Sequence, residues 1–150
     1  MMRVSLLATA FVLAAQSAGV SGQLTRTTTT VGCVEVSKAR SIVTAEGRLI
    51  LRHMPGPPNF ESIRRGDEDR LTLILVLPKS ACIDDGGQFA NPKARFTTVH
   101  IWSLDPAVHR KLKEAVGKVV TITGEGYARD NALHYAPLVI EAKSVVARRR

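Results

Sequence analysis

Residues 96–124 read FTTVHIWSLDPAVHRKLKEAVGKVVTITG, and their pattern is the most informative about the fold. Apolar residues alternate along its two ends, as in strands, whereas the middle repeats them at helical spacing. Asp105 and Pro106 predict where the helix begins, because Asp caps free N–H groups and Pro suits the first helical position. Gly117 predicts its end, since glycine readily adopts the left-handed conformation found there. A strand, a helix and a second strand are therefore expected.

The expected helix is amphipathic. Lys111 and Lys113 are turned to solvent, and the opposite side carries an apolar stripe of Val108, Leu112, Ala115 and Val116. A helix with one apolar face of this kind is expected to cover the core of a β domain.

Strand patterns flank this unit on both sides. Residues 71–77 are apolar on both faces, as in a central strand. In residues 41–52, Glu46, Arg48 and Arg52 share the solvent face, and the face predicted to turn inward holds Val43, Ala45, Gly47, Leu49 and Leu51. A glycine on the inward face allows a long strand to bend. The last strand, residues 137–146, is expected to turn inward Leu138, Ile140 and Ala142.

Three strands (residues 41–52, 71–77 and 96–103), a helix and two further strands (119–124 and 137–146) follow the order of an OB-fold. We therefore predict a mainly β domain at residues 41–147, an OB-like five-stranded Greek-key barrel with one helix between strands 3 and 4. An antiparallel sheet packed on one helix is the alternative architecture. Residues 23–40 are expected to form a Thr-rich leader and N-terminal segment, and residues 148–150 a basic tail.

The N-terminus has the order of a secretory signal peptide. Arg3 supplies the positive charge, residues 4–15 form an apolar run, and the small residues up to Gly22 suit cleavage before Gln23. The run is shorter than the roughly 20 residues that a membrane span needs. A lipid anchor is not expected, because Cys33 does not directly follow the run. We expect that residues 1–22 are removed and that the mature protein is exported, to the periplasm or beyond the cell.

Cys33 and Cys82 are the only cysteines. In an oxidising compartment such a pair most often forms a structural disulfide. Metal binding is the alternative, but two distant cysteines without a nearby His make a poor site.

The chain carries a formal charge of +8, which becomes +7 when the signal peptide with its single charged residue, Arg3, is removed. Such a charge favours anionic partners. Part of it lies in the C-terminal Arg148–Arg150 tail, and aromatic residues make up only 5% of the chain. Without a basic stripe interleaved with aromatic residues, nucleic-acid binding is not expected.

Residues 54–63, MPGPPNFESI, form the most unusual segment. Its three prolines fix the backbone and remove donors, so the loop is stiff and cannot join a sheet ladder. The segment lies between the first two predicted barrel strands, where OB-folds often take ligands. It is either a rigid lid of the barrel or a pre-organised binding loop, and both interpretations stay open at this point.

The same motif, PGPPNFESI (residues 55–63) with Gly66-Asp67 and Cys82-Ile83 after it, resembles the exported bacterial family known as domain of unknown function 4431. The similarity continues through residues 117–124 and the hairpin ending at Pro137, and covers residues 43–145. In that family the hairpin carries a His-rich turn, Thr-Gly-His-His-His-Thr-Pro. Residues 131–137 here read NALHYAP, so only His134 and Pro137 match. The resemblance implies an exported OB-like module without an established activity.

The four histidines show no zinc-ligand spacing. His134 with Asp130, in the predicted last hairpin, is the best candidate for a ligand contact or a weak metal site, but a plain solvent-exposed turn is the favoured interpretation. Asp84-Asp85-Gly86-Gly87 lacks the alternating acids of a calcium loop and predicts a turn.

The sequence contains no nucleophile elbow, metalloprotease helix or phosphate loop. We therefore expect no enzymatic activity, cofactor or resident metal.

These features together predict a non-catalytic binding module of the bacterial cell envelope, whose partner is another envelope protein, a glycan or a small anion. The contact surface is expected to join the proline-rich loop to the last hairpin through Asn59, Phe60, Glu61, Arg64, Arg65, Tyr127, Arg129, His134 and Tyr135. Two alternatives are a small metal-dependent or hydrolytic protein using His134 and Asp130, and a structural or immunity-type envelope component.

Overall fold

The computed structural model describes residues 33–36 and 41–148. In chain order the elements are β1 (Cys33–Glu35), β2 (Ile42–Pro55), the short 3-10 helix η1 (Ile63–Arg65), β3 (Asp69–Asp84), β4 (Phe96–Trp102), α1 (Pro106–Glu114), β5 (Val119–Ala128) and β6 (Leu138–Ala147). The predicted signal peptide and the Thr-rich part of the leader lie outside the described residues. Within the described ranges, no helix is long and apolar enough to cross a membrane.

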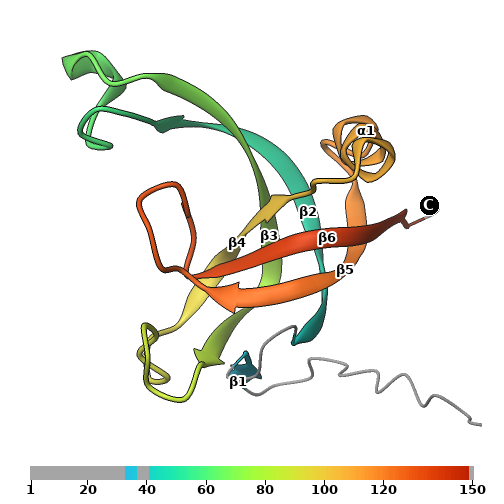
Figure 1. Ribbon diagram of the computed structural model, residues 1–150. Coiled ribbons are helices and arrows are strands. Elements are labelled where there is room, and N and C mark those ends of the chain that lie inside the picture. The colour runs from blue at the N-terminus through green and yellow to red at the C-terminus, as the bar shows by residue number, and fades with distance from the viewer. Residues whose placement is uncertain (1–32, 37–40, 149–150) are drawn as a thin grey trace, which may run out of the picture.

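Five strands close into a barrel (Figure 1). The neighbours run β3-β2-β5-β6-β4, and β4 pairs back onto β3. The β4–β6 pairing is parallel, and the other four barrel pairings are antiparallel. This closure, with the single helix between β4 and β5, is that of an OB-like barrel and confirms the predicted fold class.

The core contains side chains that lie directly opposite one another on neighbouring strands. Leu49 of β2 lies opposite Leu75 of β3, which lies opposite Val99 of β4, and Val99 lies opposite Leu138 of β6. None of these four side chains is more than 1% exposed. Full burial of each such side chain stabilises the fold by about 1.5–3 kcal/mol.

β2 pairs with β5 along its first half and with β3 along its second half, and Gly47 lies next to the point where the partner changes. Residues 42–48 pair with β5, and residues 48–55 pair with β3. A Cβ at Gly47 would collide with the carbonyl oxygen of Val76 and lie 3.1 Å from Cγ of Leu75. The glycine predicted to let this strand bend is therefore required by the close approach of β3.

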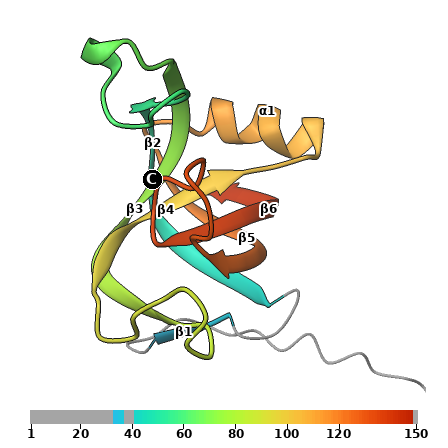
Figure 2. The same ribbon diagram turned by 60° about the vertical axis from the view of Figure 1, so that its left-hand side comes forward.

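The helix α1 begins where Asp105 predicts and ends shortly before Gly117. The side chain of Asp105 accepts hydrogen bonds from the backbone N–H groups of Ala107, at 2.7 Å, and Val108. The predicted stripe packs against the barrel core, with Val108, Leu112 and Ala115 buried. Gly117 follows with φ +85°, as predicted. In Figure 2 the helix lies across one end of the barrel.

Two predictions about the strands are wrong. Leu51 was expected to face the core, yet it is 45% exposed, because it lies at the rim where β2 and β3 leave the barrel. The second strand was expected to end at Leu77, whereas β3 continues to Asp84. Its register to β4 shifts between Val76 and Ala81, and Pro78 falls in this gap, where no ladder donor is needed.

β1 is a strand that the sequence pattern did not reveal. It pairs in parallel with the end of β3, and Cys33 lies opposite Cys82. These two residues form the predicted disulfide. The segment from Cys33 to Val36 therefore belongs to the domain, although we expected it to precede the barrel.

Beyond the barrel, β2 and β3 continue as a two-stranded ribbon that carries the proline-rich loop at its tip (Figures 1 and 2). The ribbon pairs residues 52–55 with residues 69–72. This projection leaves one side of β3 open, and the candidate site forms there.

Candidate functional site

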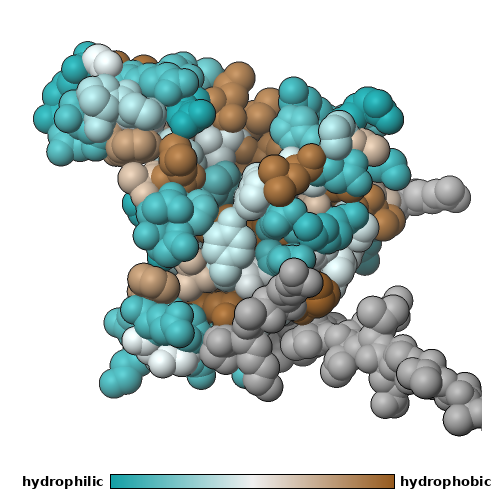
Figure 3. Space-filling view, in the orientation of Figure 1, coloured by the Kyte–Doolittle hydropathy of each residue, from teal (hydrophilic) through white to brown (hydrophobic). Residues whose placement is uncertain are grey.

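A groove of about 750 Å³ lies where the ribbon meets the barrel, and we call it the β3–β4 groove. Five elements contribute to it: β2 and β3 at the barrel rim, the end of β4, the exposed side of α1, and the β5–β6 loop. Its lining residues are Leu51, Arg70, Leu71, Thr72, Leu73, His100, Ile101, Trp102, His109, Lys113, Leu133, His134 and Tyr135. Apolar side chains gather near this junction of ribbon and body in the space-filling view (Figure 3). The size is that of a small-ligand site, and OB-folds often bind ligands on this part of the barrel.

Aromatic and imidazole rings cluster along one side of the groove. The ring of His100 lies 5.6 Å from that of Tyr135 and 6.2 Å from that of His134. The ring of Tyr127 packs edge-on against His134 at 5.2 Å, and its hydroxyl accepts a hydrogen bond of 2.7 Å from Nε1 of Trp102. The β5–β6 loop is thereby packed onto the outer surface of β4.

His134 is held within this cluster and is not a plain solvent-exposed residue. Its side chain is only 14% exposed, and Oδ1 of Asp130 lies 2.8 Å from its Nδ1. The pair is at ion-pair distance without the geometry of a hydrogen bond. Asn131 shapes the turn, because its side-chain oxygen accepts from the N–H of Leu133 at 2.9 Å. The exposed-turn interpretation of His134 is therefore wrong.

Two buried polar atoms in this cluster have neither a hydrogen-bond partner nor an ion-pair partner. They are Nδ1 of His100 and the hydroxyl of Tyr135. Nδ1 of His134 also makes no hydrogen bond, but it lies 2.8 Å from the carboxylate of Asp130. All three residues line the β3–β4 groove. Because buried polar groups in folded proteins are nearly always satisfied, the two unpartnered atoms need a ligand or an ordered water in the groove as a partner.

The groove is positive at its rim and apolar at its floor. None of the described residues that line it is acidic, and Arg70 and Lys113 lie on different sides of it. Acids beside the lining residues are Glu68, 3.8 Å from Nε of Arg70, Asp130 beside His134, and Asp69, which precedes Arg70 and pairs with His53. Three exposed leucines, Leu51, Leu71 and Leu133, add apolar surface. The arrangement favours a ligand that combines apolar groups with negative charge.

Burial shifts the pKa values of the groove's titratable groups. Burial, together with the charge of nearby His134, lowers the pKa of His100 to about 4. Burial also raises the pKa of Tyr135, an effect that Arg70 opposes and Glu68 reinforces. At neutral pH the groove therefore presents a neutral His100 imidazole and a protonated Tyr135 hydroxyl.

We expect His100 to titrate near pH 4 when its ring protons are followed by NMR, because charging its buried ring is unfavourable. The unfolded chain binds this proton with a pKa near 6.5, so the stability that depends on neutral His100 is complete above pH 6.5 and is lost as the pH falls towards 4. His134→Gln should raise the pKa of His100, because the second charge is removed. His109→Gln, on α1, is the matched control and should leave it unchanged. A midpoint near 6.5 for His100 would contradict the burial of its ring.

The proline-rich loop is built around one carboxylate. Asp67 accepts hydrogen bonds from the backbone N–H groups of Asn59, Glu61 and Ser62, at 2.7 to 2.9 Å. The bond from Ser62 does most to lower the pKa of Asp67, burial opposes it, and the bonds from Asn59 and Glu61 lower it further. The loop is therefore ordered from within at the tip of the ribbon and does not lie over the barrel as a lid.

The predicted contact residues divide between two places. His134 and Tyr135 line the groove, and Tyr127 packs behind them. Arg129 is exposed at the start of the β5–β6 loop, with its Nε 3.4 Å from the carbonyl oxygen of Asn131. None of the five residues predicted from the proline-rich loop lines the groove, and they are Asn59, Phe60, Glu61, Arg64 and Arg65.

Sequence reasoning missed Arg70, His100, Trp102, His109 and Lys113. They come from β3, β4 and α1, and each one alone reads as an ordinary strand or helix residue. The only hint in the sequence is that the β4 pattern places His100 and Trp102 on one face.

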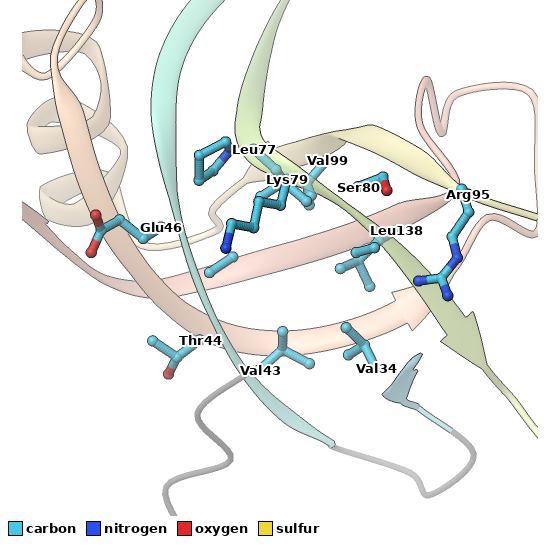
Figure 4. Close-up of a pocket in the computed structure, with 13 residues that line it drawn as sticks. Val34, Val43, Thr44, Glu46, Leu77, Lys79, Ser80, Arg95, Val99 and Leu138 are labelled. Carbon is cyan, nitrogen blue, oxygen red and sulfur yellow. The ribbon is translucent and has the colours of Figure 1, made fainter. Parts of the chain in front are cut away.

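A second cavity, of about 330 Å³, opens between β2 and β3 towards the other end of the barrel. Val34, Val43, Val99 and Leu138 line it, and Glu46, Lys79 and Arg95 stand around its mouth (Figure 4). It exists because β3 departs from β2 beyond Arg48 and shifts its register to β4. Its lining includes no buried unpartnered polar atom, so it is a weaker candidate than the groove.

Acidic side chains elsewhere hold loops in place. Asp85 is buried, which raises its pKa, yet the backbone N–H groups of Phe89, Ala90, Gly87 and Gln88 outweigh that effect and the pKa is lowered. The predicted turn at residues 84–87 is therefore organised by its own carboxylate.

Within residues 33–36 and 41–148, no three His, Cys, Asp or Glu side chains converge on a metal-sized site.

Comparison with other proteins adds no relative: the sequence matches no model of a known protein family, and no curated protein is similar to it.

Proposed function

We propose that this protein is an exported binding module whose ligand lies in the β3–β4 groove. The observation that carries this proposal is the pair of buried, unpartnered polar atoms on His100 and Tyr135, beside the ion pair of His134 with Asp130. A ligand with donors and acceptors would satisfy them when it displaces water from the groove.

The ligand has both apolar groups and negative charge. Leu51, Leu71 and Leu133 offer exposed apolar surface, and Arg70 and Lys113 offer positive charge. Of the predicted partner classes, an anion or a segment of another envelope protein fits this chemistry better than a neutral glycan.

Export is part of the proposal. The predicted signal peptide supports it, and so does the Cys33–Cys82 disulfide, because such bonds persist mainly in oxidising compartments. The resemblance of the proline-rich motif to an exported bacterial family points in the same direction and belongs to the same proposal.

The anionic, aromatic dye 8-anilinonaphthalene-1-sulfonate is a suitable probe of the groove. We expect it to bind with increased fluorescence and to shift the NMR signals of His100 and Tyr135. Leu71→Asp should weaken dye binding at least about tenfold, because it places a negative charge on the apolar floor. Leu71 is 62% exposed, so the fold should tolerate the change.

Val146→Asp is the matched control, because Val146 is 65% exposed and lies outside the groove. It should bind the dye as the unmodified protein does. Equal binding by the Leu71→Asp variant, or dye shifts confined to the barrel end near Val34, would refute the groove as the ligand site.

A second candidate function is proton transfer at His134. It is favoured by Asp130, whose Oδ1 lies 2.8 Å from Nδ1 of His134, since a carboxylate in this place can orient a general base. Asp130→Asn separates the two functions. It should leave dye binding unchanged if the groove only binds, and it should abolish turnover if His134 acts as a base.

A further inference from the structure

We infer that the partner is an extended acidic peptide segment that adds to the open edge of β3 as a further strand. This inference rests on the proposed binding function of the β3–β4 groove and names the class of its ligand. It follows from the pairing of β3, from the faces that line the groove, and from the charge of its rim.

The edge of β3 is open over residues 69–72. These residues pair with β2 on one side, whereas the last β3–β4 pair is Leu73 with Ile101. No strand faces the other side of residues 69–72 in the described part of the chain. Such an edge presents alternate N–H and C=O groups that an added strand can pair with.

The chain itself leaves this edge free. After Trp102 it turns away from β3, and the hydroxyl of Ser103 holds the turn by donating to the carbonyl oxygen of Ala142 at 2.8 Å. The same hydroxyl oxygen accepts from the N–H of Asp105 at 3.2 Å, directly before α1. An added peptide would occupy the line that β4 would have followed beyond Trp102.

The groove wraps around the edge and does not lie on one face of the strand. Side chains of consecutive strand residues point to opposite faces, so a ligand on one face would contact every second residue. Four consecutive residues of β3, from Arg70 to Leu73, line the groove. Leu71 and Leu73 lie on the face of Leu51, and Arg70 and Thr72 lie on the opposite face. A strand set beside this edge would place its own side chains alternately into both halves.

The two halves suit different side chains. Apolar residues of the peptide would pack on Leu51, Leu71 and Leu73, below Lys113 of α1. On the other face, Arg70 and the unpartnered polar atoms of His100 and Tyr135 would receive carboxylates. Because no described lining residue is acidic, a segment that alternates apolar and acidic residues is the best match.

The probe is a fluorescently labelled hexapeptide of alternating valine and glutamate, measured by fluorescence anisotropy with the oxidised protein. Two further peptides carry N-methyl groups on either the three valines or the three glutamates. Strand addition uses every second peptide N–H, so one N-methylated peptide should lose binding at least about tenfold while the other keeps it. NMR signals of residues 69–73 should shift with the peptide that binds.

Charge provides a second readout. Replacing the glutamates by lysines should remove binding. Arg70→Glu should weaken binding of the glutamate peptide by at least about threefold, because Arg70 lies on the face that receives the carboxylates, whereas Lys111→Glu, outside the groove, should not.

The outcomes separate this inference from the function on which it rests. Equal loss or equal retention with both N-methylated peptides overturns strand addition. Dye binding in the groove without peptide binding overturns the peptide partner and leaves the proposed function standing. If neither the dye nor the peptide binds, the proposed function fails as well.

Discussion

Replacing both disulfide cysteines, as Cys33→Ala with Cys82→Ala, should lower the free energy of unfolding by about 4 kcal/mol. The two residues are 49 positions apart, so the bond removes much of the conformational freedom of the unfolded chain. It also fixes β1, a strand of three residues that pairs only with the end of β3. Urea denaturation followed by circular dichroism measures the change, and alanine avoids placing a hydroxyl at the buried Cys82.

Reduction of the unmodified protein is the control for this prediction. Dithiothreitol should destabilise the unmodified protein by a similar amount and should have no effect on the double variant. Retention of the full unfolding free energy by the double variant would show that the disulfide and β1 contribute nothing to the stability of the barrel.

Gly124→Ala should destabilise the protein by about 3 kcal/mol, the upper end of the range for overpacking. Gly124 lies in β5 where the register to β6 shifts. A Cβ there would collide with the carbonyl oxygen of Glu141 and would lie 2.8 Å from Cα of Ala142. Both contacts are with backbone, so no side-chain rotation can relieve them, and the β5–β6 pairing must loosen.

Gly87→Ala is the matched control, because it adds the same methyl group in open space. Gly87 has φ +80°, and a Cβ added to it would have no neighbouring atom within 4 Å, so only backbone strain of about 1 kcal/mol is expected. Thermal unfolding of the two variants should therefore differ clearly. Equal midpoints would mean that β5 and β6 can separate at Gly124 without loss of the barrel.

The β3–β4 groove could be used either for ligand binding or for proton transfer by His134. Had the β5–β6 loop stood apart in solvent, a catalytic role for His134 would have had no cleft to work in. The loop instead packs on β4, with His100 and Tyr127 against His134. Binding and proton transfer thus compete for the same place, and the Asp130→Asn variant distinguishes them.

The candidate site was only partly predictable. His134 and Tyr135 were predicted as contact residues because they lie in the last hairpin, where His134 has Asp130 nearby, and both line the groove. Phe60 and Arg65 were chosen because their loop is rich in proline, but the ribbon carries that loop away from the barrel. The stiffness of the loop is a local property, whereas its position depends on how far β2 and β3 run beyond their pairing with β5 and β4.

Local sequence patterns are sufficient to predict the order of the five barrel strands and the helix, the cap at Asp105, the turn at Gly117 and the inward face of β6. These features depend on neighbours within a few residues, through hydrogen bonds to nearby backbone and through apolar periodicity. The exposure of Leu51, and the groove that Arg70, His100 and Lys113 line together with His134, depend instead on contacts between distant segments. The physical reason is that barrel closure pairs strands distant in sequence, and the point where each pairing stops determines which edge and which side chains stay uncovered.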